Sequence, residues 1–149
     1  MLISINSFKP NGMNFKELDY STVGNENFPG LVGVEVIDVK VNSASARMVV
    51  KDKHFAPNGY LHAGSIVTLA DTIAGYGCLY NLPDQGLSFT TIEMKINFLG
   101  AIKGGSILAE AILRHGGKTT QVWDVTVKNE ENGKSIALFR CTQLILYAK

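Results

Sequence analysis

The segment that decides the fold is AGSIVTLADTIAGYGCLY, residues 63–80. Its apolar side chains recur at the three- and four-residue spacing of a helix face, at Ile66, Leu69, Ala70, Ile73 and Ala74. Pro83 follows shortly afterwards, and proline cannot continue a helix. We therefore predict one long helix over residues 63–80.

Strand patterns lie on both sides of this helix. They are rich in valine and isoleucine, and turn residues such as Gly116-Gly117 and Asn132-Gly133 separate them. The six predicted strands cover residues 31–41, 44–50, 91–98, 106–113, 121–128 and 136–147. Apolar and polar residues alternate without exception in the third of these segments. The order predicts an α+β fold in which a curved antiparallel sheet wraps around one central helix. We expect one domain over residues 1–149, with residues 1–30 as an irregular lead-in that can hold a short helix near residues 14–20.

The charge balance argues against several classes of partner. The net charge is +1 and 18% of the residues are charged, which provides no basic surface for nucleic acid or a membrane. No apolar run reaches the roughly 18 residues of a membrane span, and residues 1–12 lack the pattern of a signal peptide. Cys78 and Cys141 lie in apolar segments far apart, which favours buried reduced thiols over a metal site. We therefore expect a cytoplasmic protein with no metal and no nucleic-acid or membrane partner.

The predicted helix is unusually rich in small residues, including Gly64, Gly75 and Gly77. A glycine inside a helix costs about 0.5–1 kcal/mol relative to alanine. Some compensating contact is expected, and the close approach of strands or of a second subunit would supply it.

Asp71 is the anomaly in this helix, because apolar residues surround it in the sequence. A helix enclosed by a sheet buries most of its surface, and an ionised carboxylate there is costly unless it is paired or solvated. Asp71 therefore reaches either a cleft or a subunit boundary, where it has a chemical role, or the one wet face of the helix. This residue alone does not decide between the two.

The start of the helix, His62-Ala63-Gly64-Ser65, is a second chemical feature. Free backbone N–H groups and the positive end of the helix dipole can stabilise a developing oxyanion. Asp71 lies two turns further on, about 11–12 Å along the axis, which is too far for both features to touch one carbonyl group. Two antiparallel helices would bring the start of one beside Asp71 of the other, so we expect a homodimer or homotetramer.

Residues 58–72, NGYLHAGSIVTLADT, resemble the signature of the hotdog thioesterases. That signature is a glycine, two residues, His-Gly-Gly, and then Leu-Ala-Asp on the central helix. The resemblance extends over residues 31–147 and points to the branch of phenylacetate-pathway and Arthrobacter-type 4-hydroxybenzoyl-CoA thioesterases. It implies the hotdog fold, hydrolysis of an acyl-CoA or aryl-CoA thioester to the free acid and CoA, and no cofactor.

The same resemblance implies roles for individual residues. Asp71 would activate water or attack the thioester carbonyl, and the backbone N–H of Ala63 would be the oxyanion donor. His62 would orient the substrate or the helix start, and Thr91 falls near the attacking water. The candidates for substrate binding, two of them cations that suit the phosphates of CoA, are Gly64, Asn58, Arg114 and Lys118.

The chain departs from the family pattern at two positions. Ala63 stands where the family has glycine, which keeps the backbone N–H but narrows the space for the thioester. Ala56 stands six residues before His62, where the family has a polar Asn or Gln. Either Asn58 or His54 replaces that group, or its role is missing in this chain. For His54, a surface or loop histidine is the simpler expectation.

Two other functions remain open. Hotdog hydratases of enoyl thioesters pair an Asp with a His a few residues later, whereas here no histidine follows Asp71 until His115. A non-catalytic acyl-CoA-binding sensor usually carries a separate DNA-binding domain, and this chain has neither the length nor the charge for one.

Overall fold

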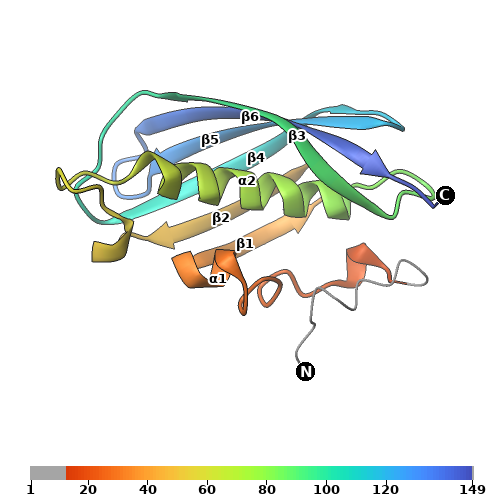
Figure 1. Cartoon of the computed structure of the whole chain (residues 1–149), viewed down its shortest axis with the longest axis horizontal. Helices are drawn as coiled ribbons and strands as arrows, with labels where there is room; N and C mark the ends of the chain where they lie inside the picture. Colours follow the sequence, from red (N-terminus) through yellow and green to blue (C-terminus); the bar gives the residue numbers. More distant parts are fainter. Residues whose placement is uncertain (1–12, 149) are drawn as a thin grey trace.

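The computed structural model describes residues 13–148, so expectations for residues 1–12 lie outside this range. Six strands pair antiparallel in the order β1-β2-β4-β5-β6-β3. Their bounds are β1 Val34–Lys40, β2 Ser43–Val49, β3 Ser88–Phe98, β4 Ser106–Gly116, β5 Thr120–Asn129 and β6 Ser135–Leu146. Helix α2, Ala63–Tyr80, lies across one face, and the sheet curves around it (Figure 1). The predicted long helix and the six predicted strands are confirmed.

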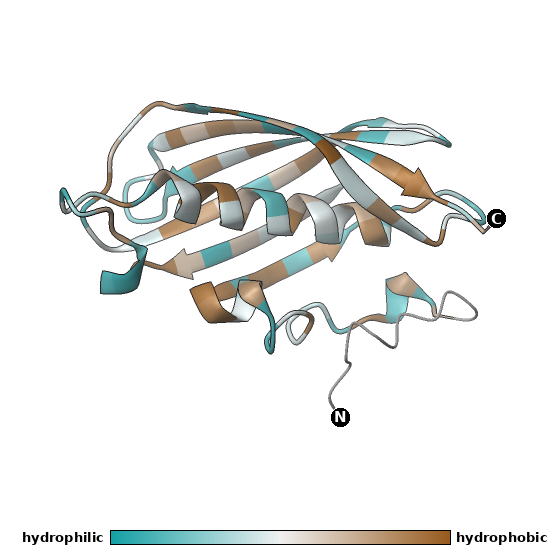
Figure 2. Cartoon of the chain, in the orientation of Figure 1, coloured by the Kyte–Doolittle hydropathy of each residue, from teal (hydrophilic) through white to brown (hydrophobic). Residues whose placement is uncertain are grey.

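The core lies between α2 and the sheet. Helix α2 contacts every strand, and hydrophobic and hydrophilic residues alternate along the strands beneath it (Figure 2). The largest buried apolar side chains come from both layers and include Met48, Leu69, Ile73, Ile107 and Trp123. Burying such side chains is the main favourable contribution to folding.

Two glycines of α2 allow this helix to approach the sheet closely. A Cβ atom at Gly77 would lie 2.7 Å from the Trp123 ring, and one at Gly75 would lie 2.9 Å from the Phe89 ring. Trp123 is held in place because its Nε1–H donates to Gln121 Oε1 at 2.9 Å. The contact that compensates for these two glycines therefore lies within one chain.

The segment before β1 differs from the expectation. A strand was expected from Leu31 onwards, but Phe28–Val32 forms the short helix α1, and β1 begins only at Val34. Pro29 lies in the first turn of α1, where it is tolerated, and Gly33 ends it in the left-handed region with φ 79°. Near residues 14–20, where a short helix was expected, the structure has the 3-10 turn η2, Phe15–Glu17. A further 3-10 turn, η3, spans Asp52–His54.

The lead-in packs against the side of α2 that the sheet leaves open. The hydroxyl of Tyr76 on α2 donates to the Val23 carbonyl at 2.9 Å. The Tyr20 ring is buried and lies 5.7 Å from that of Tyr76 and 6.4 Å from that of Tyr80, centroid to centroid.

None of the helices within residues 13–148 combines the length and the apolar character that a membrane-spanning helix needs.

Strand β3 is an edge strand, and its alternation is interrupted. The register with β6 shifts between Thr91 and Glu93, which leaves Ile92 in a bulge and 56% exposed. Met94 and Phe98 face the helix side of the sheet but remain nearly half exposed, because no strand of residues 13–148 lies beyond them. The expected unbroken alternation over 91–98 is therefore wrong at one residue.

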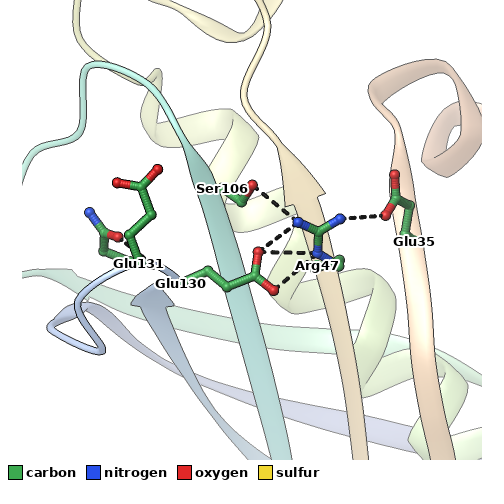
Figure 3. A network of polar contacts seen from close by, with 6 residues as sticks. Glu35, Arg47, Ser106, Glu130 and Glu131 are labelled. Atoms are coloured by element: carbon green, nitrogen blue, oxygen red, sulfur yellow. Dashed lines mark hydrogen bonds and ion pairs between the residues drawn. The ribbon is translucent and has the colours of Figure 1, made fainter.

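The outer face of the sheet is charged. Arg47 on β2 reaches Glu35 at 3.0 Å, Glu130 at 2.7 Å and the Ser106 hydroxyl at 3.2 Å, which links β1, β2, β4 and the turn after β5 (Figure 3). Exposed pairs of this kind contribute little to stability, typically about 0–1 kcal/mol each. Their main effect is to keep this face solvated.

We predict that Gly77→Ala destabilises the fold. At an open helix position this change would stabilise by about 1 kcal/mol, but here the new methyl group meets a rigid buried ring. The expected loss is about 1–3 kcal/mol in the free energy of unfolding, measured by urea denaturation. Gly104→Ala is the control, because nothing lies within 4 Å of a Cβ atom there; a Gly77→Ala protein more stable than wild type would contradict the close packing.

Candidate active site

The start of α2 is built by His62. This residue has extended backbone angles, φ −66° and ψ 136°, and its Nδ1 accepts the Gly64 amide proton at 2.8 Å. Its carbonyl accepts the Ser65 amide proton at 2.9 Å. A Cβ atom at Gly64 would lie 2.9 Å from Nδ1, so the cap requires a residue without a side chain there. Since Nδ1 accepts, a neutral His62 carries its proton on Nε2.

One amide at this helix end remains unclaimed. The caps take the amides of Gly64 and Ser65, while no hydrogen bond of the described residues uses the amide of Ala63, which is exposed. This N–H lies at the positive end of an 18-residue helix. It is therefore available to an anionic oxygen of a ligand.

His54 supports the segment before the helix. Its imidazole is buried, and Nδ1 accepts the Lys51 amide proton at 2.9 Å. Its carbonyl accepts from the His62 amide at 2.9 Å and from the Ser65 hydroxyl at 3.0 Å. Burial lowers the pKa of His54, which keeps the ring neutral. The expectation of a surface or loop histidine is wrong here, because the 3-10 turn folds this ring inward.

Asp71 lies two turns along α2, half-buried, and faces strand β3. Its Oδ1 is 3.5 Å from Thr91 Oγ1, and no Lys, Arg or His of the described residues forms an ion pair with it. Burial raises the pKa of Asp71, and the hydrogen bond from Thr91 offsets part of that rise. A desolvated carboxylate without a cation is typical of a functional site.

Gln143, the residue that accepts the Thr91 hydroxyl proton, was not identified from the sequence. The Thr91 hydroxyl donates to Gln143 Oε1 at 2.8 Å, and Gln143 is fully buried on β6 directly across from Thr91. The signal available in the sequence was a glutamine inside the otherwise apolar segment 136–147. Alternation alone could not show that this glutamine faces the helix.

The structure thus brings Asp71 and Thr91 together, and places Ala63, Gly64 and His62 at the helix start. Eight residues separate Ala63 from Asp71 on the same helix, which corresponds to about 12 Å. One carbonyl group cannot reach both ends within a single chain.

The other candidates lie away from Asp71. Asn58 is exposed in the turn before α2, where its Oδ1 accepts the Tyr60 amide proton at 3.2 Å. Arg114 lies on the outer face of the sheet and pairs with Asp124 at 2.9 Å. His54, the other candidate to replace the polar group absent at Ala56, is buried, and its Nδ1 accepts from the Lys51 amide.

Lys118 lies in the β4–β5 turn, near the C-terminal end of α2. It lines an open cavity of about 590 Å³ together with Pro83, Asp84, Gln85, Thr119 and Tyr147. This end of the helix is the one opposite Ala63, so Lys118 and the helix start do not form one site within a single chain.

Comparisons with known proteins agree with this arrangement. Residues 58–136 match the family model of the thioesterase superfamily. A 1,4-dihydroxy-2-naphthoyl-CoA hydrolase of Listeria monocytogenes is 32% identical over 111 residues, which cover 74% of this chain and 89% of the relative. The acyl-coenzyme A thioesterase PaaI of Escherichia coli is 32% identical over 110 residues, which cover 73% and 75%.

A solved structure supports the same assignment. The crystal structure of a Streptococcus mutans protein bound to acetyl CoA has a TM-score of 0.70 and 27% identity, covering 78% of this chain and 91% of that chain. The single helix enclosed by a six-stranded antiparallel sheet is the hotdog fold expected from the sequence. The family match covers more than half of the sequence, and the chain therefore belongs to the thioesterase superfamily.

Proposed function

We propose that this protein hydrolyses acyl-CoA or aryl-CoA thioesters to the free acid and CoA, with Asp71 as its catalytic carboxylate. The observation that carries the proposal is the half-buried carboxylate with no cationic partner among the described residues, on a helix whose first amide is unclaimed. The names of the two relatives, and the acetyl CoA bound to the Streptococcus mutans protein, support a CoA thioester as the substrate.

The proposed reaction uses water as the nucleophile. Asp71 accepts a proton from the water, whose oxygen attacks the thioester carbonyl carbon, and the backbone N–H of Ala63 stabilises the oxyanion. The C–S bond then breaks, and the CoA sulfur leaves with the proton. Thr91 gives the water a second polar contact, and His62 fixes the helix start. A base whose pKa lies above that of an ordinary aspartate accepts this proton more readily.

We also propose that the working unit is a homodimer, or a tetramer of such dimers. One chain cannot bring Ala63 and Asp71 to the same carbonyl, whereas antiparallel α2 helices from two chains can. The exposed apolar side chains along edge strand β3, at Ile92, Met94 and Phe98, support this strand as the place where two subunits meet.

Three further proposals concern the domain organisation, the branch of the family and the cellular compartment. We propose one thioesterase domain over residues 1–149, related to the phenylacetate-pathway and Arthrobacter-type branch and acting in the cytoplasm. The two buried free thiols, Cys78 and Cys141, fit a reducing compartment.

The hydratase alternative is less well supported. That chemistry pairs an aspartate with a histidine, and the three histidines lie at His54, His62 and His115. Within the described part of the chain, none of the three forms a hydrogen bond or ion pair with Asp71.

We predict that Asp71→Asn removes turnover and leaves the fold intact. An amide cannot accept the proton, so thiol release from a panel of acyl-CoA and aryl-CoA esters should fall by about 10²–10⁴. Burial raises the pKa of Asp71, so its ionised form destabilises the folded state at neutral pH. The variant should therefore melt at or above the wild-type temperature at pH 7, and the difference should vanish below the ordinary aspartate pKa of 3.8.

Asp124→Asn is the matched control, and its expected change in melting temperature at pH 7 has the opposite sign. Arg140 and Arg114 hold the pKa of Asp124 below its usual range, so its ionised form stabilises the fold and the variant should melt lower at pH 7. Its turnover should stay near wild type, because it lies on the outer face of the sheet. An Asp71→Asn protein that folds normally and keeps wild-type turnover would show that Asp71 is not catalytic.

We predict that Ala63→Pro strongly lowers turnover while the helix still forms. Proline is favoured at the first position of a helix, and the preceding His62 already has the extended angles that proline requires. The substitution therefore removes little besides one N–H, and the loss should be about 10²–10³ in kcat. Ala63→Gly should keep or raise turnover. Activity in Ala63→Pro with an unchanged circular dichroism spectrum would place the oxyanion donor elsewhere.

We predict that the protein sediments as a dimer or tetramer at micromolar concentration. Met94→Lys adds a charge to the β3 edge and should yield monomers with little turnover, whereas Ile112→Lys, at an equally exposed apolar position on the outer face, should do neither. A wild-type protein that is monomeric and still hydrolyses thioesters would refute the shared site.

A further inference from the structure

Gln143 is a polar side chain that the proposed reaction does not yet use. Its exposed fraction is 0%, and its neighbours along β6 on the same face are the buried residues Cys141 and Ile145. Its Oε1 accepts the Thr91 hydroxyl proton at 2.8 Å, and its Nε2 donates to Cys141 Sγ at 3.3 Å. A buried amide is costly unless it is hydrogen-bonded, and here its stronger hydrogen bond goes to a residue beside Asp71.

The Thr91 hydroxyl has one proton and two acceptors within reach. Gln143 Oε1 is 2.8 Å from Thr91 Oγ1, a normal O–H···O distance, whereas Asp71 Oδ1 is 3.5 Å away, at the limit of such a bond. The shorter contact takes the larger share of the proton. The lone pairs of the Thr91 oxygen are then left toward the Asp71 side.

We infer that Gln143 is a positioning residue, which holds the Thr91 proton so that Thr91 and Asp71 act together as acceptors for the attacking water. One O–H of that water points to Asp71 and the other to Thr91, and a lone pair of the water is directed at the thioester carbonyl. The inference rests on the proposed function and names the buried group that orients the nucleophile. Without Gln143, Thr91 turns its proton to Asp71 and competes with the water for the carboxylate.

The other charged and titratable groups of β3 and β6 do not account for the expected effect of Gln143 on the pKa of Asp71. Cys141 is the titratable group of β6 that faces Asp71, and burial raises the pKa of this thiol to about 12, so it stays neutral. The charged residues of β3, Glu93 and Lys95, are register partners of Thr142 and Arg140 and lie on the outer face. Thr91 is therefore the neighbour through which Gln143 acts on Asp71.

The test compares two buried glutamines on adjacent strands. Gln143→Met keeps an unbranched side chain of similar length but removes the acceptor oxygen. Gln121→Met is the matched control: Gln121 is also fully buried and pairs with Gln143 across the sheet, but its amide binds the Asn81 carbonyl and the Trp123 indole, not Thr91. Both are assayed by thiol release from acyl-CoA esters across pH, with melting curves as a check on folding.

We expect Gln143→Met to lower kcat by about tenfold and to move the acid limb of kcat down by about one pH unit, the size of one hydrogen bond to a charged group. The sign follows from the Thr91 proton, which in the variant donates fully to ionised Asp71 and lowers its pKa below that of wild type, where the shorter hydrogen bond goes to Gln143. Gln121→Met should leave the limb in place. In a Thr91→Val background, Gln143→Met should cause no further shift, because the hydroxyl is gone.

Each other outcome overturns the inference. The inference is wrong if the acid limb of kcat does not move in Gln143→Met, or if it moves equally in Gln121→Met. It is also wrong if Gln143→Met still moves the acid limb in the Thr91→Val background. If Gln143→Met does not fold, Gln143→Leu, which also lacks the acceptor oxygen, takes its place, and an unmoved acid limb in that variant refutes the role. Failure of the proposed function is distinct, since wild type would then release no thiol and Asp71→Asn would change nothing.

Discussion

The close approach of helix α2 to the sheet is the constraint on which the rest of this structure depends. Gly75 and Gly77 remove the side chains that would keep Phe89 and Trp123 away. A six-stranded sheet can then curve around a single helix and bury most of that helix. The intrinsic cost of glycine in a helix is offset by the apolar area that two aromatic rings bury against it.

The same enclosure changes the environment of Asp71. A carboxylate on an exposed helix would be an ordinary solvated group, but Asp71 is half-buried between α2 and strand β3, and burial raises its pKa. The helix start stays open, because the His62 side chain caps the Gly64 amide, the His62 carbonyl binds the Ser65 amide, and the Ala63 amide is left free. The close packing and the raised pKa of Asp71 thus have one origin, the depth at which this helix lies in the sheet.

A short polar row runs through the otherwise apolar floor of the sheet. Thr91, Gln143 and Gln121 are consecutive register partners on β3, β6 and β5. Gln121 serves packing, since it holds the Trp123 ring against Gly77 and binds the Asn81 carbonyl at the end of α2. Gln143 faces the other way, toward Thr91 and Asp71. Two identical residues side by side therefore have different partners, one in the packing of Trp123 and the other at the Thr91 hydroxyl beside Asp71.

The sequence by itself determined the elements, because their signals are local. The spacing of apolar residues over 63–80, the strand periodicities, and the turns at Gly116-Gly117 and Asn132-Gly133 depend only on near neighbours along the chain. The helix α1 escaped detection because its five residues, with a proline and a glycine, resemble a loop extension of the next strand.

The tertiary structure decided the features that depend on which strands pair across long distances in the sequence. Which strand is the edge, and hence why Met94 and Phe98 remain exposed, follows from the order β1-β2-β4-β5-β6-β3 and not from any local pattern. The same holds for Arg114, which the sheet turns outward to Asp124. The contact of Gln143 with Thr91 joins residues 52 positions apart, and sequence periodicity carries no information about a partner that only the register of two strands brings within hydrogen-bonding distance.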